Sequence, residues 1–194
     1  MRTHTFIVRH FHTVNENVVY DGIYDEGRPY VSIISKYITK HNIKEIEFKT
    51  SDTPRTITTS MVLNRLFIER FPQLKINRVE TYEALTRDPK RVRCQEISDH
   101  FKNLNSQTVV NEDEHKLVIY ITHSSCYKPI YKGLLRGICN NDNKIDKLTR
   151  NERIVPNALS YVSNYDANST FYNMNVLKEY NLRKAANQTS DPAK

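Results

Sequence analysis

The sequence predicts an α/β fold, a single-domain three-layer α/β/α sandwich with a mostly parallel central sheet and helices on both faces. Two patterns predict it. Short β-prone runs alternate along the chain with stretches of helical periodicity. The most hydrophobic run, residues 117–121, is typical of a strand buried on both faces of a parallel sheet. The 194 residues suffice for one core, and no repeat or linker divides them. We therefore expect one domain over residues 1–184 and a disordered tail over 185–194.

The amino-terminal half predicts two strands and two helices. Apolar residues at helical spacing and alternation of apolar with charged residues distinguish the two kinds of element. Thr53 can cap the second helix, with Pro54 in its first turn, where the missing N–H costs little. In chain order, the expected elements are a strand over 5–8, a helix over 29–41, a strand over 43–48 and a helix over 54–71.

The second half continues the alternation. The buried run ends at His123, after which Ser124 and Ser125 open a helix. In chain order, the expected elements are a strand over 74–79, a short helix near 97–104, the buried strand over 117–121, a helix from 124 to about 136, and late strands near 161–162 and 170–172.

Three of the predicted strands lead directly into basic residues or imidazoles. The first ends at Arg9 and His10, the second leads through Ser51 and Asp52 to Arg55, and the buried strand ends at His123. Ligands of α/β sheets collect beyond the carboxyl ends of the strands. If these strands are parallel neighbours, two histidines and two arginines converge on one site.

This set of residue types suits phosphoryl transfer. During its transfer, a phosphoryl group is stabilised by positioning and by fixed positive charge. The planar guanidinium group of arginine can donate hydrogen bonds to two phosphate oxygens at once. An imidazole is mostly neutral near pH 7 and can act as a nucleophile. Arg55 is predicted in the first turn of a helix, where the dipole and the free N–H groups favour an anion.

Five segments, in order from about residue 5 to about residue 175, resemble motifs of the histidine phosphatase (phosphoglycerate mutase-like) superfamily. The matching motifs of that family read Arg-His-Gly-Glu/Gln-Thr, Leu-Thr-x-x-Gly-Arg, Ser-Asp-Leu-x-Arg-Thr, Thr-His-Gly-Gly after a strand, and Pro-Asn-Ala/Cys. The corresponding segments here are Phe6–Thr13, Asp21–Arg28, Thr50–Thr56, Val118–Ser125 and Pro156–Ala158.

The resemblance implies a catalytic domain over 1–184 in which His10 takes up the phosphoryl group and Arg9, Arg55 and His123 bind it. An acidic residue after the third strand would protonate the leaving oxygen and then activate water. Glu83 is the preferred residue for this role. Glu80 and Asp88 are the alternatives, since the family's Leu-x-Glu context is not reproduced.

Further substrate contacts are expected on either side of these residues. The family places its substrate-selecting lid where this chain has residues 84–115, a segment rich in basic side chains. That lid suits a second anionic group of the substrate, although a solvated basic loop explains the same pattern. The expected substrate-binding residues are Thr13, Asn17, Ser124, Arg87 and Arg91.

Four positions depart from the family pattern. Phe11 replaces a glycine, which makes close approach of the backbone to a phosphate harder. His12 replaces Glu or Gln, and Ser124-Ser125 replaces Gly-Gly. Because the two arginines and two histidines are kept, we expect an active enzyme.

Hydrolysis of phosphomonoesters is the favoured activity. The Asn-Glu-Arg-x-Tyr-Gly stretch of phosphoglycerate mutases is not reproduced by Tyr82–Arg87, so a mutase-type phosphotransferase is the alternative. A nucleic-acid-binding module or a catalytically silent interaction domain is the alternative of another class. The net charge of +7 suits anionic partners, but no nucleic-acid recognition motif is present.

The expected partner is a small phosphorylated substrate, such as a nucleotide or phosphosugar, or a phosphopeptide. Nucleic acid is not expected as a stable partner, nor is a membrane, because no run of eighteen apolar residues occurs. No cofactor is expected. A metal on His10, His12, Asp52 and His123 is also disfavoured, since Arg9 would repel a cation. Three scattered cysteines and the lack of a secretory h-region favour the cytoplasm. The oligomeric state is left open, with a homodimer as one option.

Overall fold

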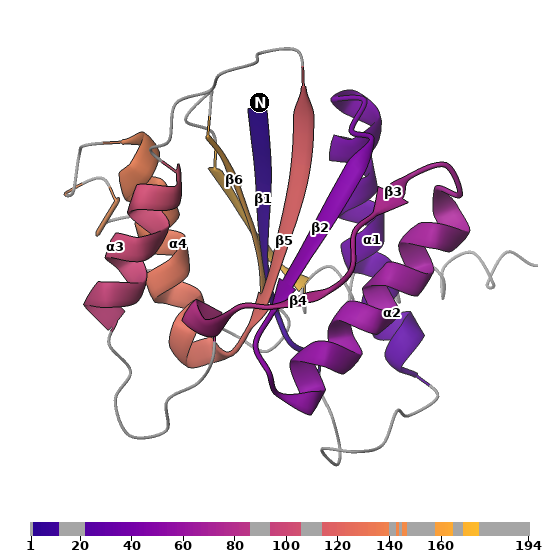
Figure 1. Cartoon of the computed structure of the whole chain (residues 1–194), viewed down its shortest axis with the longest axis horizontal. Coiled ribbons are helices and arrows are strands. Elements are labelled where there is room, and N and C mark those ends of the chain that lie inside the picture. Colours follow the sequence, from indigo (N-terminus) through magenta and orange to yellow (C-terminus); the bar gives the residue numbers. More distant parts are fainter. Residues whose placement is uncertain are drawn as a thin grey trace, which may run out of the picture.

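A seven-stranded mixed sheet forms the centre of the chain, in the order β3-β2-β5-β1-β6-β7, with β4 also paired to β2 (Figure 1). The computed structural model describes residues 2–11, 22–85, 94–105, 114–139, 143, 145–146, 158–164 and 169–174. The tail over 185–194 lies outside them. The elements are β1 (Arg2–Arg9), α1 (Ile23–Lys40), β2 (Glu45–Thr50), α2 (Pro54–Arg70), β3 (Lys75–Ile76), β4 (Glu80–Thr81), the 3-10 helix η1 (Glu83–Leu85), α3 (Cys94–Asn105), β5 (His115–Thr122), α4 (Ser124–Ile138), β6 (Ala158–Ser163) and β7 (Ser169–Asn173).

The strands that carry the predicted site are parallel neighbours. β5 pairs with β1 on one side and with β2 on the other, and both pairings are parallel. β3 and β4 extend the parallel part beyond β2, whereas β6 runs antiparallel to β1. The expectation of a mostly parallel central sheet is confirmed.

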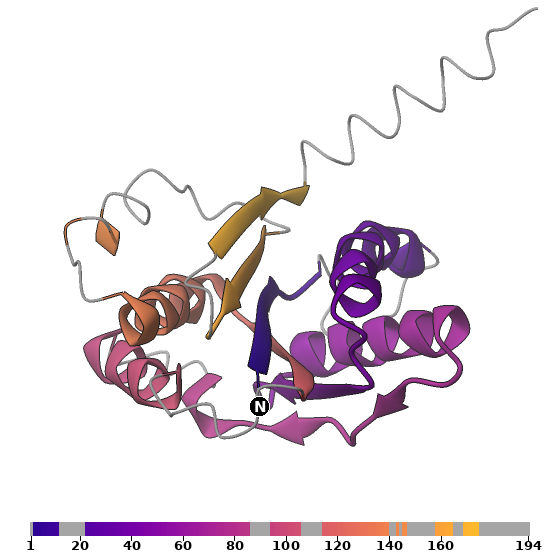
Figure 2. The same cartoon turned by 90° about the horizontal axis from the view of Figure 1, so that it is seen from above.

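Helices cover both faces of the sheet, which makes three layers (Figures 1 and 2). Side chains of β1 contribute to the core on both faces of the sheet, because successive side chains point to opposite faces of a strand. Phe6 and Val8 join the core shared with α1 and α2, whereas Ile7 joins the core shared with α3 and α4. β5 alternates in the same way, and Ile119 is fully buried on the first face.

Helices α3 and α4 approach each other closely at two glycines of α4. A Cβ atom at Gly133 would collide with the backbone carbonyl of Ser98, and one at Gly137 would lie 2.7 Å from Asn105 Cβ. The middle of the predicted lid, residues 84–115, is therefore a helix packed on the core. The lid role of this segment stays a prediction.

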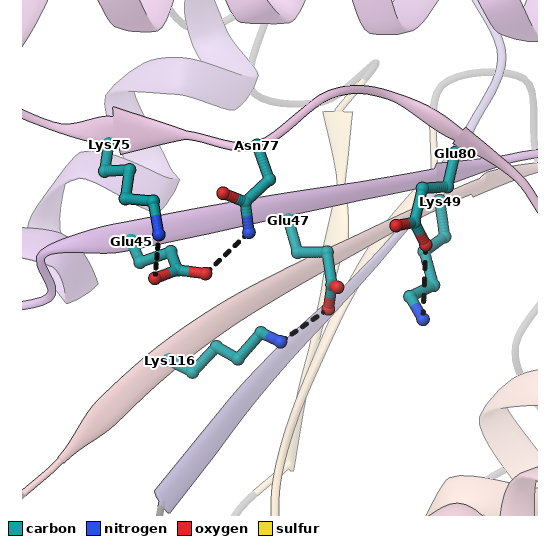
Figure 3. A network of polar contacts seen from close by, with 7 residues as sticks. All are labelled: Glu45, Glu47, Lys49, Lys75, Asn77, Glu80 and Lys116. Carbon is teal, nitrogen blue, oxygen red and sulfur yellow. Dashed lines mark hydrogen bonds and ion pairs between the residues drawn. The ribbon is translucent and has the colours of Figure 1, made fainter.

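The charged residues of β2 alternate with the buried Ile46 and Phe48, and they pair with residues of neighbouring strands (Figure 3). Because a strand alternates its faces, this pattern keeps the apolar residues on the core side. The ion pairs join Glu45 to Lys75 at 3.2 Å, Glu47 to Lys116 at 2.8 Å and Lys49 to Glu80 at 3.9 Å.

Two predicted boundaries were wrong. The first helix begins at Ile23, not at Pro29, which lies inside it. The strand expected over 74–79 is two short strands, because β3 pairs with the start of β2 and β4 with its end. Among the described residues, none of the helices combines the length and the apolar character needed to cross a lipid bilayer.

Candidate active site

Three parallel strands end level with one another at one edge of the sheet. Arg9 at the end of β1 pairs in register with Thr122 of β5, and Thr50 at the end of β2 pairs with Ile121. Backbone hydrogen bonds continue just past the strands, since His10 N–H donates to Thr122 O at 3.0 Å. The residues that follow these strands therefore emerge side by side.

His10 is held by the backbone of the next residue. Its Nδ1 lies 2.8 Å from the carbonyl oxygen of Phe11. A carbonyl oxygen only accepts, so Nδ1 is the protonated nitrogen in this hydrogen bond. In the neutral ring, Nε2 then carries the lone pair. The local backbone thus selects the tautomer in which Nε2 is available to an electrophile.

Phe11 is part of the hydrophobic core. Its side chain is fully buried and its ring lies 5.0 Å from that of Tyr30. Its N–H donates to Thr59 Oγ1 at 3.0 Å. Among the described residues, Asn42 is the non-glycine residue with a positive φ, so Phe11 needs no glycine-like backbone. The replacement of glycine is accommodated by packing the aromatic ring against Tyr30 of α1.

His123 lies against His10. The two rings have centroids 5.2 Å apart and planes at 61°, and His123 is buried, with 4% of its surface exposed. Its Nε2 lies 3.0 Å from Ser51 Oγ and 3.2 Å from Thr53 Oγ1. Two hydroxyl groups from the loop between β2 and α2 therefore set the orientation of the ring.

The start of α2 is built from hydroxyl side chains. Thr53 is the N-cap residue and Pro54 follows it, as predicted. The Thr53 side chain does not cap the helix, however. Instead, Thr53 Oγ1 lies 3.0 Å from Thr56 Oγ1, and Thr56 Oγ1 lies 2.9 Å from Ser51 Oγ. These hydroxyls form a network under His123 instead of a helix cap.

Arg9 brings a buried nitrogen to this edge of the sheet. Within the described part of the chain, its Nε is buried and makes no hydrogen bond. Burial lowers the pKa of Arg9 from its ordinary value. The charge of Tyr30 opposes this shift, and the positive charge of Arg55 adds to it. The guanidinium stays protonated at neutral pH, so two positive charges act on the same region.

Arg55 lies in the first turn of α2 and is half-buried. Its carbonyl accepts a hydrogen bond of 2.8 Å from Thr59 Oγ1, the same hydroxyl that receives the N–H of Phe11. Thr59 therefore ties the first turn of α2 to the loop after β1.

The backbone of Glu83 lies at the same edge. The N–H of Tyr82 donates to Thr50 O at 2.8 Å, and Thr122 Oγ1 lies 3.5 Å from Leu85 O. The 3-10 helix that begins at Glu83 is thus placed beside the ends of β2 and β5. The side chain of Glu83 lies outside the described atoms.

Of the alternative acids, Glu80 is exposed and forms the ion pair with Lys49 on the charged face of β2 (Figure 3). Asp88 lies outside the described residues. Ser124 is exposed and begins α4, with His123 as the N-cap residue. The remaining expected substrate contacts, Thr13, Asn17, Arg87 and Arg91, also lie outside the described residues, as does His12.

Several residues that the structure places at the site were not predicted as site residues. Tyr30 of α1 has a buried hydroxyl without a hydrogen-bond partner among the described residues, and burial raises its pKa well above the ordinary value. Ser51 and Thr53 could have been noticed, since they stand in the motif that contains Arg55. No sequence signal pointed to Tyr30, because it follows the helical periodicity of a core residue.

The layers, the strand order and the level strand ends define a three-layer α/β/α sandwich with a site at the carboxyl ends of its parallel strands. The crystal structure of a phosphoglycerate mutase from Plasmodium falciparum matches over 89% of this chain and 89% of that chain, with a TM-score of 0.50 and 11% sequence identity. That protein is a member of the histidine phosphatase superfamily. The resemblance inferred from the five motifs is confirmed at the level of the fold. No family model matches the sequence, and the search of curated proteins found no match.

Proposed function

We propose that this chain is a metal-independent phosphomonoester hydrolase that works through a phosphohistidine at His10. The observation that carries the proposal is the geometry of His10. Its Nδ1 is engaged by the Phe11 carbonyl, and its ring contacts a second, buried imidazole at the carboxyl edge of the sheet. This is the edge at which α/β sheets bind ligands.

The first step uses the lone pair of Nε2. Nε2 attacks phosphorus while the bond from phosphorus to the ester oxygen breaks, and the electron pair of that bond leaves with the oxygen. The proton on Nδ1 stays hydrogen-bonded to the Phe11 carbonyl and stabilises the positive charge that develops on the ring. The leaving oxygen receives a proton from an acidic residue, for which Glu83 is the preferred candidate.

The second step returns the enzyme to its starting state. The carboxylate formed in the first step accepts a proton from water as the water oxygen attacks the phosphohistidine. The bond from phosphorus to Nε2 breaks, and its electron pair returns to the ring. The products are inorganic phosphate and neutral His10.

Charge at the site favours a phosphate group. Arg9 and Arg55 offer guanidinium forks, and the pKa of Arg9 is lowered partly by the charge of Arg55. The N-termini of α2 and α4 both begin at this edge, where their dipoles and free N–H groups stabilise an anion. A phosphate oxygen is also a suitable acceptor for the buried Nε of Arg9, whose lack of a partner would otherwise be costly.

The substrate class that these features support is a small phosphorylated compound or a phosphopeptide. Transfer between carbons of phosphoglycerate is the second candidate, because the structural neighbour is a phosphoglycerate mutase. Hydrolysis is preferred over it because residues 82–87 lack the mutase stretch.

The test combines turnover with trapping of the intermediate. Phosphate release is measured from a panel of phosphomonoesters that includes p-nitrophenyl phosphate and 3-phosphoglycerate, and mutase product is sought in the same reactions. Rapid quenching with radiolabelled substrate should leave label on the protein that is stable in base and labile in acid. Absence of both turnover and label across the panel would overturn the proposal. If 3-phosphoglycerate is isomerised and no phosphate is released, the enzyme is a mutase and not a hydrolase.

A further inference from the structure

Three histidines from distant parts of the sequence meet at the opposite edge of the sheet from His10. His4 belongs to β1, His115 is the first residue of β5, and His41 is the C-cap residue of α1. One ring nitrogen from each lies within 4.8 Å of the other two. Among the described residues, this is the group of histidine, cysteine and acidic side chains with the spacing of a metal site.

The rings are packed together. The centroid of the His4 ring is 4.3 Å from that of His41 and 5.2 Å from that of His115, and the last two are 5.5 Å apart. His4 is fully buried, whereas His41 and His115 are half-exposed. A cluster with one buried and two accessible imidazoles has a path by which an ion can enter from solvent.

Tyr161 of β6 orients the buried histidine. Its hydroxyl lies 2.9 Å from His4 Nδ1, and its ring packs against Tyr37 with centroids 4.3 Å apart. When Nδ1–H donates to this hydroxyl, the lone pair of His4 lies on Nε2, which is 2.9 Å from His115 Nδ1. Ligating histidines commonly donate the other ring N–H to such an outer partner, which fixes the ring and its tautomer.

The dimensions of the cluster are close to those of a zinc site. Zn–N bonds of about 2.0–2.1 Å in tetrahedral geometry place the ligand nitrogens about 3.4 Å apart. The His4–His115 contact is shorter than this separation, and the whole group fits within 4.8 Å. Small rotations of the two half-exposed rings would equalise the separations. Three imidazoles with water as the fourth ligand form a common zinc donor set.

The carboxyl end of α1 adds an electrostatic field that favours a bound cation. His41 lies at the carboxyl end of an eighteen-residue helix, where the partial negative charge of the helix dipole stabilises a cation. We propose that His4, His41 and His115 bind one divalent transition-metal ion, with Zn²⁺ as the best fit. The ion would join β1, β5 and the end of α1 and so stabilise the fold, at a distance from the proposed chemistry.

Zinc titration of the full chain, freed of metal by a chelator and carrying no polyhistidine tag, tests this site. We expect one Zn²⁺ per chain and a rise in melting temperature of about 5 °C or more when free zinc exceeds the dissociation constant 100-fold. Single variants His41→Ala and His115→Ala should each weaken binding by about 100-fold or more, since even loss of an outer partner of a ligand costs 10–100-fold.

Two matched variants show where the ion binds. His100→Ala removes an exposed imidazole of α3, and His10→Ala removes one from the other edge of the sheet, so both should take up zinc as the wild type does. Because His4 is buried and its removal destabilises the core, the test relies on the two half-exposed histidines. Absence of binding to the wild type, or equal binding by His41→Ala and His115→Ala, would overturn the proposal.

Removal of zinc by a chelator distinguishes the role of this site in stability from the proposed phosphatase activity. EDTA should lower the melting temperature of the zinc-loaded chain while phosphatase turnover at 25 °C stays unchanged. Turnover that collapses on chelation at 25 °C, with the chain still folded, would contradict both the remote position of the ion and a metal-independent reaction.

Discussion

His10 and His123 face each other with ring centroids 5.2 Å apart and planes at 61°. They come from the ends of β1 and β5, which are hydrogen-bonded neighbours in register. His10 is positioned by a backbone carbonyl, whereas His123 is positioned by the hydroxyls of Ser51 and Thr53. The two rings are thus positioned by separate hydrogen bonds, so a substitution can remove the contacts of one ring without changing those of the other.

Replacing the nucleophile should abolish the covalent intermediate. We expect His10→Ala to lower turnover by at least about 100-fold and to remove the acid-labile label entirely, because the proposed reaction forms the intermediate on this imidazole. His41→Ala is the matched control, because His41 follows α1 at the opposite edge of the sheet. Stoichiometric label on the His10→Ala protein would show that another residue is the nucleophile.

The Ser51 hydroxyl should affect catalysis through His123. Ser51→Ala removes the contact to Nε2, and we expect kcat to fall about 10-fold with KM little changed, the effect of one lost positioning hydrogen bond. Ser60→Ala is the control, because Ser60 is equally buried but its hydroxyl donates to Ile57 O within α2. Equal kcat values for the two variants would argue against a positioning role.

Arg55 should contribute charge that an arginine elsewhere on α2 does not. We expect Arg55→Ala to lower turnover by about 100-fold, as deletion of a charge-stabilising group does. Arg65→Ala removes a guanidinium from the exposed ion pair with Glu69 and should leave turnover unchanged. Competitive inhibition by inorganic phosphate, compared between the two variants, reports the loss of anion affinity directly.

Close packing of α3 on α4 should depend on Gly133. The methyl group of Gly133→Ala would collide with a backbone carbonyl, so we expect the free energy of unfolding to fall by about 1–3 kcal/mol. At Gly27, the nearest atom to an added Cβ is a flexible side-chain end, Leu66 Cδ1, at 2.9 Å. Gly27→Ala should be nearly neutral, since the helix propensity of alanine offsets about 1 kcal/mol of strain. Urea unfolding of the two variants measures the difference.

The Glu45 carboxylate should stabilise the fold in a pH-dependent way. Hydrogen bonds from Asn77 and Lys75 lower the pKa of Glu45 from its ordinary value. A depressed folded-state pKa contributes stability that is present above the unfolded pKa and is lost as pH falls through the folded pKa. The melting temperature of Glu45→Gln should therefore lie slightly below that of the wild type at pH 6, and the gap should close below about pH 4.

The effect at Glu45 should be small and sensitive to salt. The Glu45 side chain is partly exposed and that of Lys75 is exposed, and salt screens ion pairs that solvent can reach. Sodium chloride at 1 M should therefore reduce the gap measured at pH 6. A gap that is the same at pH 3 and pH 6 would show that the carboxylate charge has no part in it.

Much of the fold could be predicted from local patterns. The alternating strands, the helix that begins at Pro54 and the buried run before His123 were all located by periodicity and by end signals. The start of α1 was missed, because Pro29 is typical of a first turn, whereas burial of Ile23 extends the helix toward its N-terminus. The split into β3 and β4 was missed because strand pairing with β2 is not visible in a linear pattern.

The sequence by itself determined which residues stand at the ends of the strands, since strand length and polarity are local properties. Arg9, His10, Arg55 and His123 were all named from that order. Only the tertiary structure decided that β5 lies between β1 and β2, and hence which side chains meet. The hydroxyls under His123 and the cluster of His4, His41 and His115 depend on contacts between residues distant in sequence. Such contacts form when distant segments pack together, and the local sequence pattern around each residue does not show which segments will pack.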